Sequence, residues 1–312
     1  MISDTAARLR ENIQRVIVGK DETINLALIA MLCEGHLLLE DVPGTGKTTL
    51  AKTIAASLGC TFRRVQFTPD LLPSDLTGIY YFNQKSQEFE FRPGPLMAQI
   101  LLADEINRAT PRTQSALLES MQERQVTVDI ATHALPRPFM VMATQNPIEL
   151  EGTFPLPEAQ LDRFLIKLSI GYPDESGEND ILLRFDHEDP LQTLEQVVEP
   201  EEILQLQEEV RKIKVEDSVR HYLVRVCRAT RTHGDIALGA SPRATMALYR
   251  TCQARAAIMG RAFVIPDDIK IMAPFVITHR LVLNPQTRLR GRTAEDVLRE
   301  VVETVAVPVE ST

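Results

Sequence analysis

The stretch "HLLLEDVPGTGKTTLAK", residues 36 to 52, constrains the fold of this chain more than any other. An apolar run of strand length leads into a loop rich in Gly and Thr, and the residues after Gly46 continue as a helix. The loop matches the pattern G-x-x-x-x-G-K-[ST] at its end, but the leading glycine of the pattern falls on Asp41. A strand, a glycine turn and a helix in this order predict an α/β fold with a ligand at the turn.

This loop has the chemistry of a phosphate site. Consecutive backbone N–H groups at a helix N-terminus form a concave surface that favours an anion. Lys47 can reach the terminal phosphates of a nucleotide, and the Thr48 hydroxyl can ligate Mg²⁺. We therefore expect ATP and Mg²⁺ as cofactors. The expected phosphate-binding residues are Pro43, Gly44, Thr45, Gly46, Lys47, Thr48 and Thr49.

Two neighbouring carboxylates follow about sixty residues later, in "QILLADEINRA". The four apolar residues before Asp104 indicate a buried strand, so that Asp104 stands at the strand end and can hold the metal through water. Glu105 comes next and suits a general base that polarises an attacking water. The sequence therefore predicts Asp104 as a metal residue and Glu105 as a catalytic one.

Short apolar strands alternate with helical segments from about residue 35 to 170, which indicates a parallel, doubly wound sheet. Ligands of such sheets bind at the carboxyl ends of the strands. Asn146, at the end of "FMVMATQNP", offers a neutral amide at this edge that can orient a water. Asn-Pro by itself is only a turn signal. The expected strands are "HLLLE", "TFRRVQF", "QILLAD", "FMVMAT" and "FLIKLSI".

Two inserts interrupt the alternation. Residues 68–95 contain a strand pair, "GIYYFN" and "EFEFRP", and residues 124–138 are typical of a hairpin. Strand signals end near residue 171, and helical runs follow, among them one capped by Ser241. We expect a nucleotide-binding core over residues 1–171, then a linker and an all-α domain over residues 172–312.

Two arginines are candidates for stabilising negative charge on a transferred phosphoryl group. Arg163 stands in "EAQLDRFLIK" before the last predicted strand, and Arg243 lies in the first turn of the helix that Ser241 caps. Most single arginines are solvated surface residues. Only the surrounding motif therefore indicates whether Arg163 or Arg243 contacts a phosphoryl group or only water.

Composition sets outer limits. The four cysteines are far apart in apolar surroundings, which favours buried free thiols in a reducing cytoplasm. The histidines have no metal-ligand spacing. We find no apolar run long enough for a membrane helix and no signal-peptide pattern. The net charge of −9 speaks against a surface built for nucleic acid.

Together, "PGTGKT", "LLADEINRA", "ATQNP", "LPEAQLDRF" and "GASPRA" resemble the MoxR family of AAA+ ATPases along nearly the whole chain. The two inserts are similar to the helix-2 insert and the pre-sensor hairpin of that clade. The resemblance implies a five-stranded parallel P-loop sheet with flanking helices and a C-terminal helical lid.

The resemblance also implies roles for single residues. Gly44 to Thr49 match Walker A, Asp104 and Glu105 match Walker B, and Asn146 matches sensor 1. Arg243 matches sensor 2, and Arg163 matches the arginine finger that is offered to a neighbouring subunit, with Arg108 and Arg112 as rivals. Val18 and Gly19 match the segment that flanks adenine. Leu150 departs from the glutamine expected there, and no catalytic step depends on it.

Several functions stay open. The resemblance implies a ring, commonly a hexamer, that hydrolyses ATP to remodel or mature other proteins with a von Willebrand factor A domain partner. The alternatives are a nucleic-acid motor of the helicase type, a magnesium chelatase-type motor subunit, and a scaffold that binds ATP without hydrolysing it. For a motor on DNA, the second insert offers Arg124, His133 and Arg137, but also Asp129.

Asp41 raises a separate question, because a carboxylate that pointed at the phosphates would oppose nucleotide binding. The core phosphate contacts come from residues after it, and Pro43 and Gly44 turn the chain between them. We expect ATP binding to survive, with the carboxylate directed elsewhere.

Overall fold

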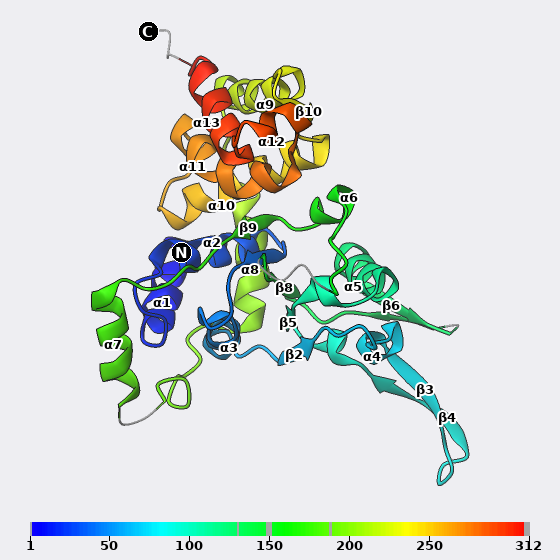
Figure 1. Cartoon of the computed structure of the whole chain (residues 1–312). Coiled ribbons are helices and arrows are strands. Elements are labelled where there is room, and N and C mark those ends of the chain that lie inside the picture. The colour runs from blue at the N-terminus through cyan, green and yellow to red at the C-terminus, as the bar shows by residue number, and fades with distance from the viewer. Residues whose placement is uncertain (1, 130, 148–151, 187–188, 309–312) are drawn as a thin grey trace.

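A central sheet, a helical part above it and a long hairpin below it make up the protein (Figure 1). The structure is a computed structural model, and it describes residues 2–129, 131–147, 152–186 and 189–308. The two parts that build the candidate site are the sheet and the helices above it.

The sheet has five strands, ordered β2-β5-β8-β1-β9, and all of its pairings are parallel. Each strand predicted from the sequence is present, with ends shifted by one or two residues. The strands are β1 (Leu37–Glu40), β2 (Phe62–Gln66), β5 (Ile100–Asp104), β8 (Met140–Gln145) and β9 (Ile166–Leu168). Their carboxyl ends therefore meet at one edge, where the loop at residues 41–46 begins.

Side chains of successive strand residues pack on opposite faces of the sheet. In β1, Leu37 and Leu39 join one buried cluster and Leu38 joins the other. The first face is covered by α1 (Ile2–Gln14), α2 (Asp21–Leu32) and α3 (Lys47–Ser57), and the second by α5 (Pro111–Glu123). Burial on both faces explains why the strands read as continuous apolar runs.

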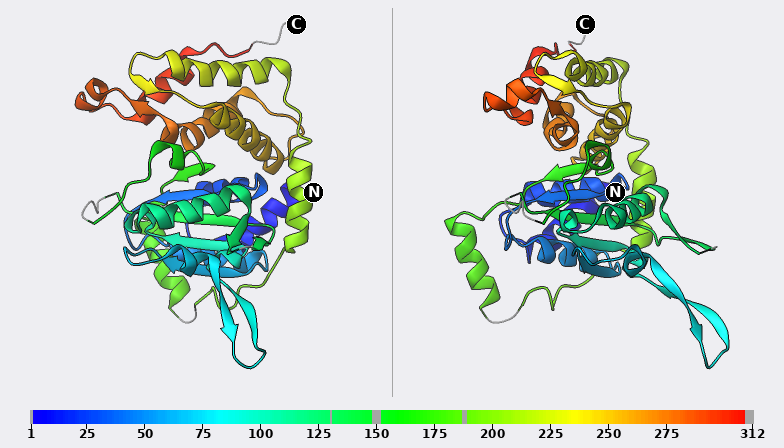
Figure 2. Two further views of the ribbon diagram at one scale, coloured as in Figure 1. Left: turned by 90° about the vertical axis from the view of Figure 1, so that its right-hand side faces the viewer. Right: turned by 45° about the vertical axis from the view of Figure 1, so that its right-hand side comes forward.

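Both inserts form the hairpins that the sequence predicts. Helix α4 (Pro73–Thr77) leads into β3 (Gly78–Asn83), which pairs antiparallel with β4 (Glu88–Pro93) and projects from the body (Figure 2). The second hairpin pairs β6 (Gln125–Val128) with β7 (Ala131–Ala134). The His133 ring stacks on Phe91 at 4.0 Å between centroids, so the two hairpins are in contact.

The C-terminal part consists mainly of helices, as predicted. Its helices are α7 (Glu175–Phe185), α8 (Pro200–Val210), α9 (Asp217–Thr232), α10 (Pro242–Ile258), α11 (Pro266–Ile277), the 3-10 turn η3 (Thr278–Arg280), α12 (Pro285–Leu289) and α13 (Ala294–Thr304). Ser241 caps α10 by accepting a hydrogen bond from the Ala244 backbone N–H. Sequence analysis missed a short antiparallel ribbon of β10 (Ile236–Leu238) and β11 (Val282–Leu283).

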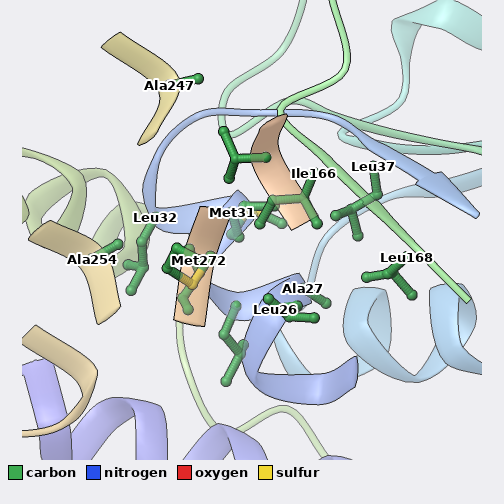
Figure 3. Close-up of a cluster of buried hydrophobic side chains, with 14 of the residues drawn as sticks. Leu26, Ala27, Met31, Leu32, Leu37, Ile166, Leu168, Ala247, Ala254 and Met272 are labelled. Atoms are coloured by element: carbon green, nitrogen blue, oxygen red, sulfur yellow. The ribbon is translucent and has the colours of Figure 1, made fainter. Parts of the chain in front are cut away.

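The helices above the sheet share one apolar core with it. In Figure 3, Ala254 of α10 lies beside Leu32 of α2, and Met272 of α11 lies near Met31 of the same helix, in the cluster that Ile166 of β9 also joins. The predicted domain boundary near residue 171 stays a prediction.

Three of the four cysteines are buried free thiols and Cys33 is half-buried. Burial raises the pKa of the Cys33 and Cys60 thiols to about 12, so they are not thiolates at neutral pH. Within the described residues, no helix is both long and apolar enough to cross a membrane.

Candidate nucleotide site

The loop between β1 and α3 is shaped as an anion site by its own backbone. Gly44 and Gly46 both have a φ of 86°, a left-handed conformation that glycine adopts without strain. A Cβ atom at either position would meet nothing within 4 Å, so there is open space against the loop. Helix α3 has no side-chain cap and no acidic residue in its first turn. Its first N–H groups are therefore available to a phosphate.

Lys47 and Thr45 hold this loop in place. Lys47 Nζ donates to the carbonyl oxygens of Asp41 at 2.9 Å and Val42 at 3.2 Å, and Thr45 Oγ1 donates to that of Val42 at 3.3 Å. The ammonium group thus lies over the loop, where a bound phosphate can replace a carbonyl as its partner. Pro43 lies in the same loop, and Thr48 and Thr49 lie in the first turn of α3; their predicted contacts with phosphate stay predictions.

The carboxylate of Asp41 points away from the loop interior. Its Oδ1 accepts from the Val42 backbone N–H at 2.9 Å, and its Oδ2 accepts from those of Ile170 and Gly171 at 2.8 Å each. The residue is buried, and it ties the end of β1 to the chain that leaves β9. The side chain that departs from the phosphate-loop pattern is therefore a backbone anchor.

A pocket of about 210 Å³ lies beside the loop. Val18 lines it together with Gly44, Thr45, Gly46 and Thr49, and Gly19, with a φ of 64°, turns the chain next to it. Ile181 and Phe185 of α7 also line it, within the stretch after residue 171 where the sequence predicts a linker. The pocket is mostly apolar opposite the loop, which suits a nucleobase beside the phosphates.

The predicted carboxylates stand at the neighbouring strand end. Asp104 is the last residue of β5, and Glu105 follows with a φ of 56°, unusual for a residue other than glycine. Thr144, buried in β8, joins the two. Its hydroxyl donates to Asp104 Oδ1 at 2.6 Å and accepts from the Glu105 backbone N–H at 2.8 Å.

The outer oxygens of both carboxylates are paired as well. Asp104 Oδ2 accepts from Arg64 at 2.6 Å, and Glu105 Oε2 accepts from Gln66 Nε2 at 2.7 Å and Arg108 Nη1 at 3.1 Å. Sequence analysis did not single out Arg64 or Gln66, although these two polar residues stand two positions apart in "FRRVQ" and so lie on one exposed face of the strand. Arg108, a rival for the arginine finger, is thus a neighbour of Glu105 in its own chain.

Asn146 comes directly after β8, at the same edge as Asp104 and the loop. The register of β1 with β8 pairs Glu40 with Gln145, which brings Asn146 level with the start of the loop. The neighbouring position Leu150 lies outside the described residues. Asn146, Asp104 and Lys47 therefore share one edge of the sheet.

The two candidate arginines lie at the opposite edge. Arg163 precedes β9, whose first residue Ile166 pairs with Leu37 at the start of β1. Arg163 and Arg243 line one cavity of about 290 Å³ with Gly35 and Gln122, and Arg243 Nη2 is 3.4 Å from Gln122 Oε1. Neither residue lines the pocket beside the loop. Arg112, the other rival, is exposed at the start of α5.

Comparison with known proteins places this geometry in a family. Residues 36–166 match the ATPase family associated with various cellular activities (AAA), and residues 228–301 match the AAA lid domain. The chain is 43% identical over 313 residues to Chaperone MoxR1 of Mycobacterium tuberculosis, covering 97% of this chain and 82% of that protein. It belongs to the MoxR family of AAA+ ATPases.

Two further relatives support the assignment. YeaC of Bacillus subtilis, an uncharacterized protein, is 52% identical over 300 residues, which are 96% of this chain and 94% of that one. A crystal structure of a candidate ATPase from Cytophaga hutchinsonii matches with a TM-score of 0.93 and 37% identity, covering 99% of this chain and 96% of the other. The match spans the sheet and the lid helices together.

In this MoxR-family chain the donors near the loop fit Mg²⁺ that arrives with a nucleotide. Thr48 offers a hydroxyl and Asp104 a carboxylate, and Mg²⁺ takes one or two protein carboxylates together with phosphate oxygens and water. Across the described part of the chain, no group of three or more His, Cys, Asp and Glu side chains would hold a cation without the nucleotide.

The basic residues of the second hairpin are engaged inside the chain. Arg124 and Arg137 both pair with Glu34, at the end of α2, and Arg211 pairs with its other oxygen at 2.5 Å. Although burial alone would raise it, the pKa of the Glu34 carboxyl is lowered by the hydrogen bond and charge of Arg124 and the charges of Arg137 and Arg211. Both hairpin arginines therefore already have a carboxylate partner in their own chain, although three arginines share its single negative charge.

Proposed function

We propose that this protein hydrolyses ATP with Mg²⁺ at sites that neighbouring copies complete in a ring. We also propose that hydrolysis drives the remodelling or maturation of other proteins. The observation that carries the proposal is the separation of the site residues. Lys47, Asp104 and Glu105 stand at one edge of the sheet, and Arg163 and Arg243 at the other.

Nucleotide binding rests on the edge of the sheet that carries the loop at residues 41–49, which we call the loop edge. The N–H groups of Gly44 to Thr49 and the Lys47 ammonium would hold the phosphates, and the base would lie in the pocket between Val18 and Phe185. Thr48 and Asp104 would hold Mg²⁺, which supplies charge neutralisation on the phosphate oxygens when it is bound.

Hydrolysis needs a base and an oriented water. Glu105 is the proposed base that takes the proton from the attacking water, and Asn146 is the proposed residue that orients this water. The hydrogen bonds from Gln66 and Arg108 and the Thr144 contact to its backbone fix the direction of the Glu105 side chain. A fixed base favours a single attack direction.

The proposed ring rests on where Arg163 and Arg243 lie. Charge that develops on the γ-phosphate in the transition state calls for a further cation, and an arginine supplied there is worth about 10³ to 10⁵ in rate. Arg163 and Arg243 line a cavity near the amino end of β1, and neither of them lines the pocket beside the loop of their own chain. We infer that both act in trans, on the nucleotide of the next copy, as a closed homo-oligomer, for example a hexamer, would allow.

The biological role rests on the relatives. One of them is named a chaperone, and we propose the same class of role here, with a von Willebrand factor A domain protein as partner. Capture of such a protein by the purified chain in the presence of ATP, and its absence with ADP, would test that part.

The enzymatic part is tested with Glu105→Gln. The variant should bind ATP as tightly as wild type and hydrolyse it roughly 10² to 10⁴ times more slowly, because it lacks only the base. Glu119→Gln, on the exposed side of α5, is the matched control and should hydrolyse at the wild-type rate. Equal, slow turnover by wild type and Glu105→Gln would instead mean that the protein binds ATP without hydrolysing it.

A further inference from the structure

A buried arginine joins the lid helices to the residues around Arg163. Arg280 lies in the turn η3 after α11, and only 6% of it is exposed. A buried guanidinium costs free energy unless its N–H groups and its charge are all satisfied. The partners that satisfy Arg280 therefore indicate what it holds in place.

Those partners flank Arg163 on both sides. Arg280 Nε donates to Asp162 Oδ1 at 2.7 Å, and Nη2 donates to the carbonyl oxygens of Phe164 at 2.6 Å and Asp162 at 3.2 Å. Its Nη1 donates to the Leu165 carbonyl at 3.3 Å and to that of Val276 in α11. The rigid fork of one guanidinium thus ties three carbonyl groups of the loop around Arg163, those of Asp162, Phe164 and Leu165, to the lid.

Two more lid residues hold the same loop. His279 Nε2 lies 3.1 Å from the Phe164 carbonyl oxygen, and Ser241 Oγ lies 3.4 Å from Asp162 Oδ2. Ser241 is also the cap of α10, two residues before Arg243. The backbone that carries Arg163 and the helix that carries Arg243 are therefore parts of one hydrogen-bonded unit.

Arg163 itself is not used in this unit. Within the described part of the chain its guanidinium makes no hydrogen bond or ion pair, and it lines the cavity that Arg243 also lines. Arg280 therefore binds the loop, whereas the loop carries Arg163 with its guanidinium free to reach another group.

We propose that Arg280 is a positioning residue that locks Arg163 to the lid. The lid then delivers Arg163 and Arg243 together to the nucleotide of the next copy. This inference rests on the proposed function, in which the two arginines act in trans. It adds that the position of the lid, rather than of the sheet alone, sets whether both cations reach the γ-phosphate.

The first test is Arg280→Gln in the full chain. We expect ATP binding to stay at the wild-type level, because the loop at residues 41–49 lies at the other edge of the sheet. The kcat should fall about 100-fold with little change in KM, since a misplacement of about 1 Å is enough for such a loss. Arg280→Lys should fall nearly as far, because an ammonium group cannot reproduce the fork.

Arg261→Gln is the matched control. Arg261 is a lid arginine that pairs with the fully buried Asp268, which keeps Arg255 as a second partner, and it makes no contact with the loop around Arg163. This variant loses a partly buried lid ion pair but should hydrolyse ATP within about twofold of wild type.

Mixing experiments separate positioning from a general role in folding. Arg280→Gln has an intact loop edge. A Lys47→Ala variant has an intact arginine edge, the opposite edge of the sheet with Arg163 and Arg243. Hydrolysis should therefore reappear when the two variants are mixed. Arg280→Gln mixed with Arg163→Ala should stay inactive, because both variants lack the same half of the site.

Three results would overturn the inference: full activity of Arg280→Gln, loss of its ATP binding or assembly, or rescue by Arg163→Ala instead of Lys47→Ala. Failure of the proposed function is distinguishable, because it would appear as a wild type that does not hydrolyse ATP or as an Arg163→Ala variant with the full rate. Either of those results removes both proposals.

Discussion

The two edges of the sheet are built in different ways. At the loop edge, the groups that we propose to bind phosphate come from one short stretch, Pro43 to Thr49, and most of them are backbone N–H groups. At the arginine edge, Arg163 and Arg243 come from segments about 80 residues apart, and Arg280, in a third segment, is hydrogen-bonded to the loop that carries Arg163. The first edge needs only local folding, whereas the second exists only when the lid packs on the sheet.

Because the two edges are separate, a variant defective at the loop edge should be complemented by one defective at the arginine edge. Lys47→Ala should lose ATP binding, and Arg163→Ala should bind ATP but hydrolyse it about 10³ to 10⁵ times more slowly. Mixing the two inactive variants should restore turnover, because one supplies an intact loop edge and the other an intact arginine edge. Rates of phosphate release before and after mixing measure this.

Mixing fails to restore activity if both edges serve the nucleotide of the same chain. That outcome would make Arg163 and Arg243 residues that act in cis after a large movement of the lid. The trans assignment would then be wrong, although the assignment of Lys47 would stand.

The arginine edge should also be the more sensitive to acid. His36, at the start of β1, is buried there. Its Nδ1 accepts from the Val141 backbone N–H at 2.9 Å, so Nε2 carries the proton and donates to the Met121 carbonyl at 3.1 Å. Burial, with a smaller effect of the Arg124 charge, lowers the pKa of His36 to about 4. The unfolded chain therefore binds this proton more tightly than the folded chain.

His36 should therefore contribute a stability that is complete above pH 6.5 and is lost as the pH falls toward 4. The loss is about 1.4 kcal/mol for each pH unit and about 3 kcal/mol over the whole window. Denaturant unfolding of wild type and His36→Gln between pH 8 and pH 4 measures it. The variant should be less stable at pH 8 but should lose less on acidification.

Part of the acid sensitivity should remain in His36→Gln, because burial also lowers the pKa of His279, which contacts the loop around Arg163. An identical pH dependence in wild type and variant would show that His36 does not titrate in this range.

At the loop edge the smallest effect on function is expected from Asp41. Its carboxylate accepts three backbone N–H bonds, and Asp41→Gly would leave those of Ile170 and Gly171 without their acceptor, at a cost of about 1 to 3 kcal/mol. ATP affinity should nevertheless stay within about an order of magnitude, or 1.4 kcal/mol. Thermal unfolding and nucleotide titration of the same variant separate the two effects, and a larger loss of affinity would mean that Asp41 contacts the nucleotide.

The sequence by itself determined the loop edge and the sheet. The strands around "HLLLE" and "QILLAD", both hairpins and the cap at Ser241 were predictable, because each depends on residues within a few positions of one another. The same locality put Lys47, Asp104 and Asn146 at one edge, since the carboxyl ends of parallel strands must meet.

Only the tertiary structure decided the rest. That Asp41 anchors the chain after β9, that Thr144 and Gln66 bind the two carboxylates, and that α7 lines the pocket beside the loop depend on contacts between distant segments. Arg280 has no motif of its own and reads as one basic residue among many. The positioning role that we propose for it rests on burial, because each N–H group of a buried guanidinium needs a partner, and the Asp162 and Phe164 partners lie on either side of Arg163.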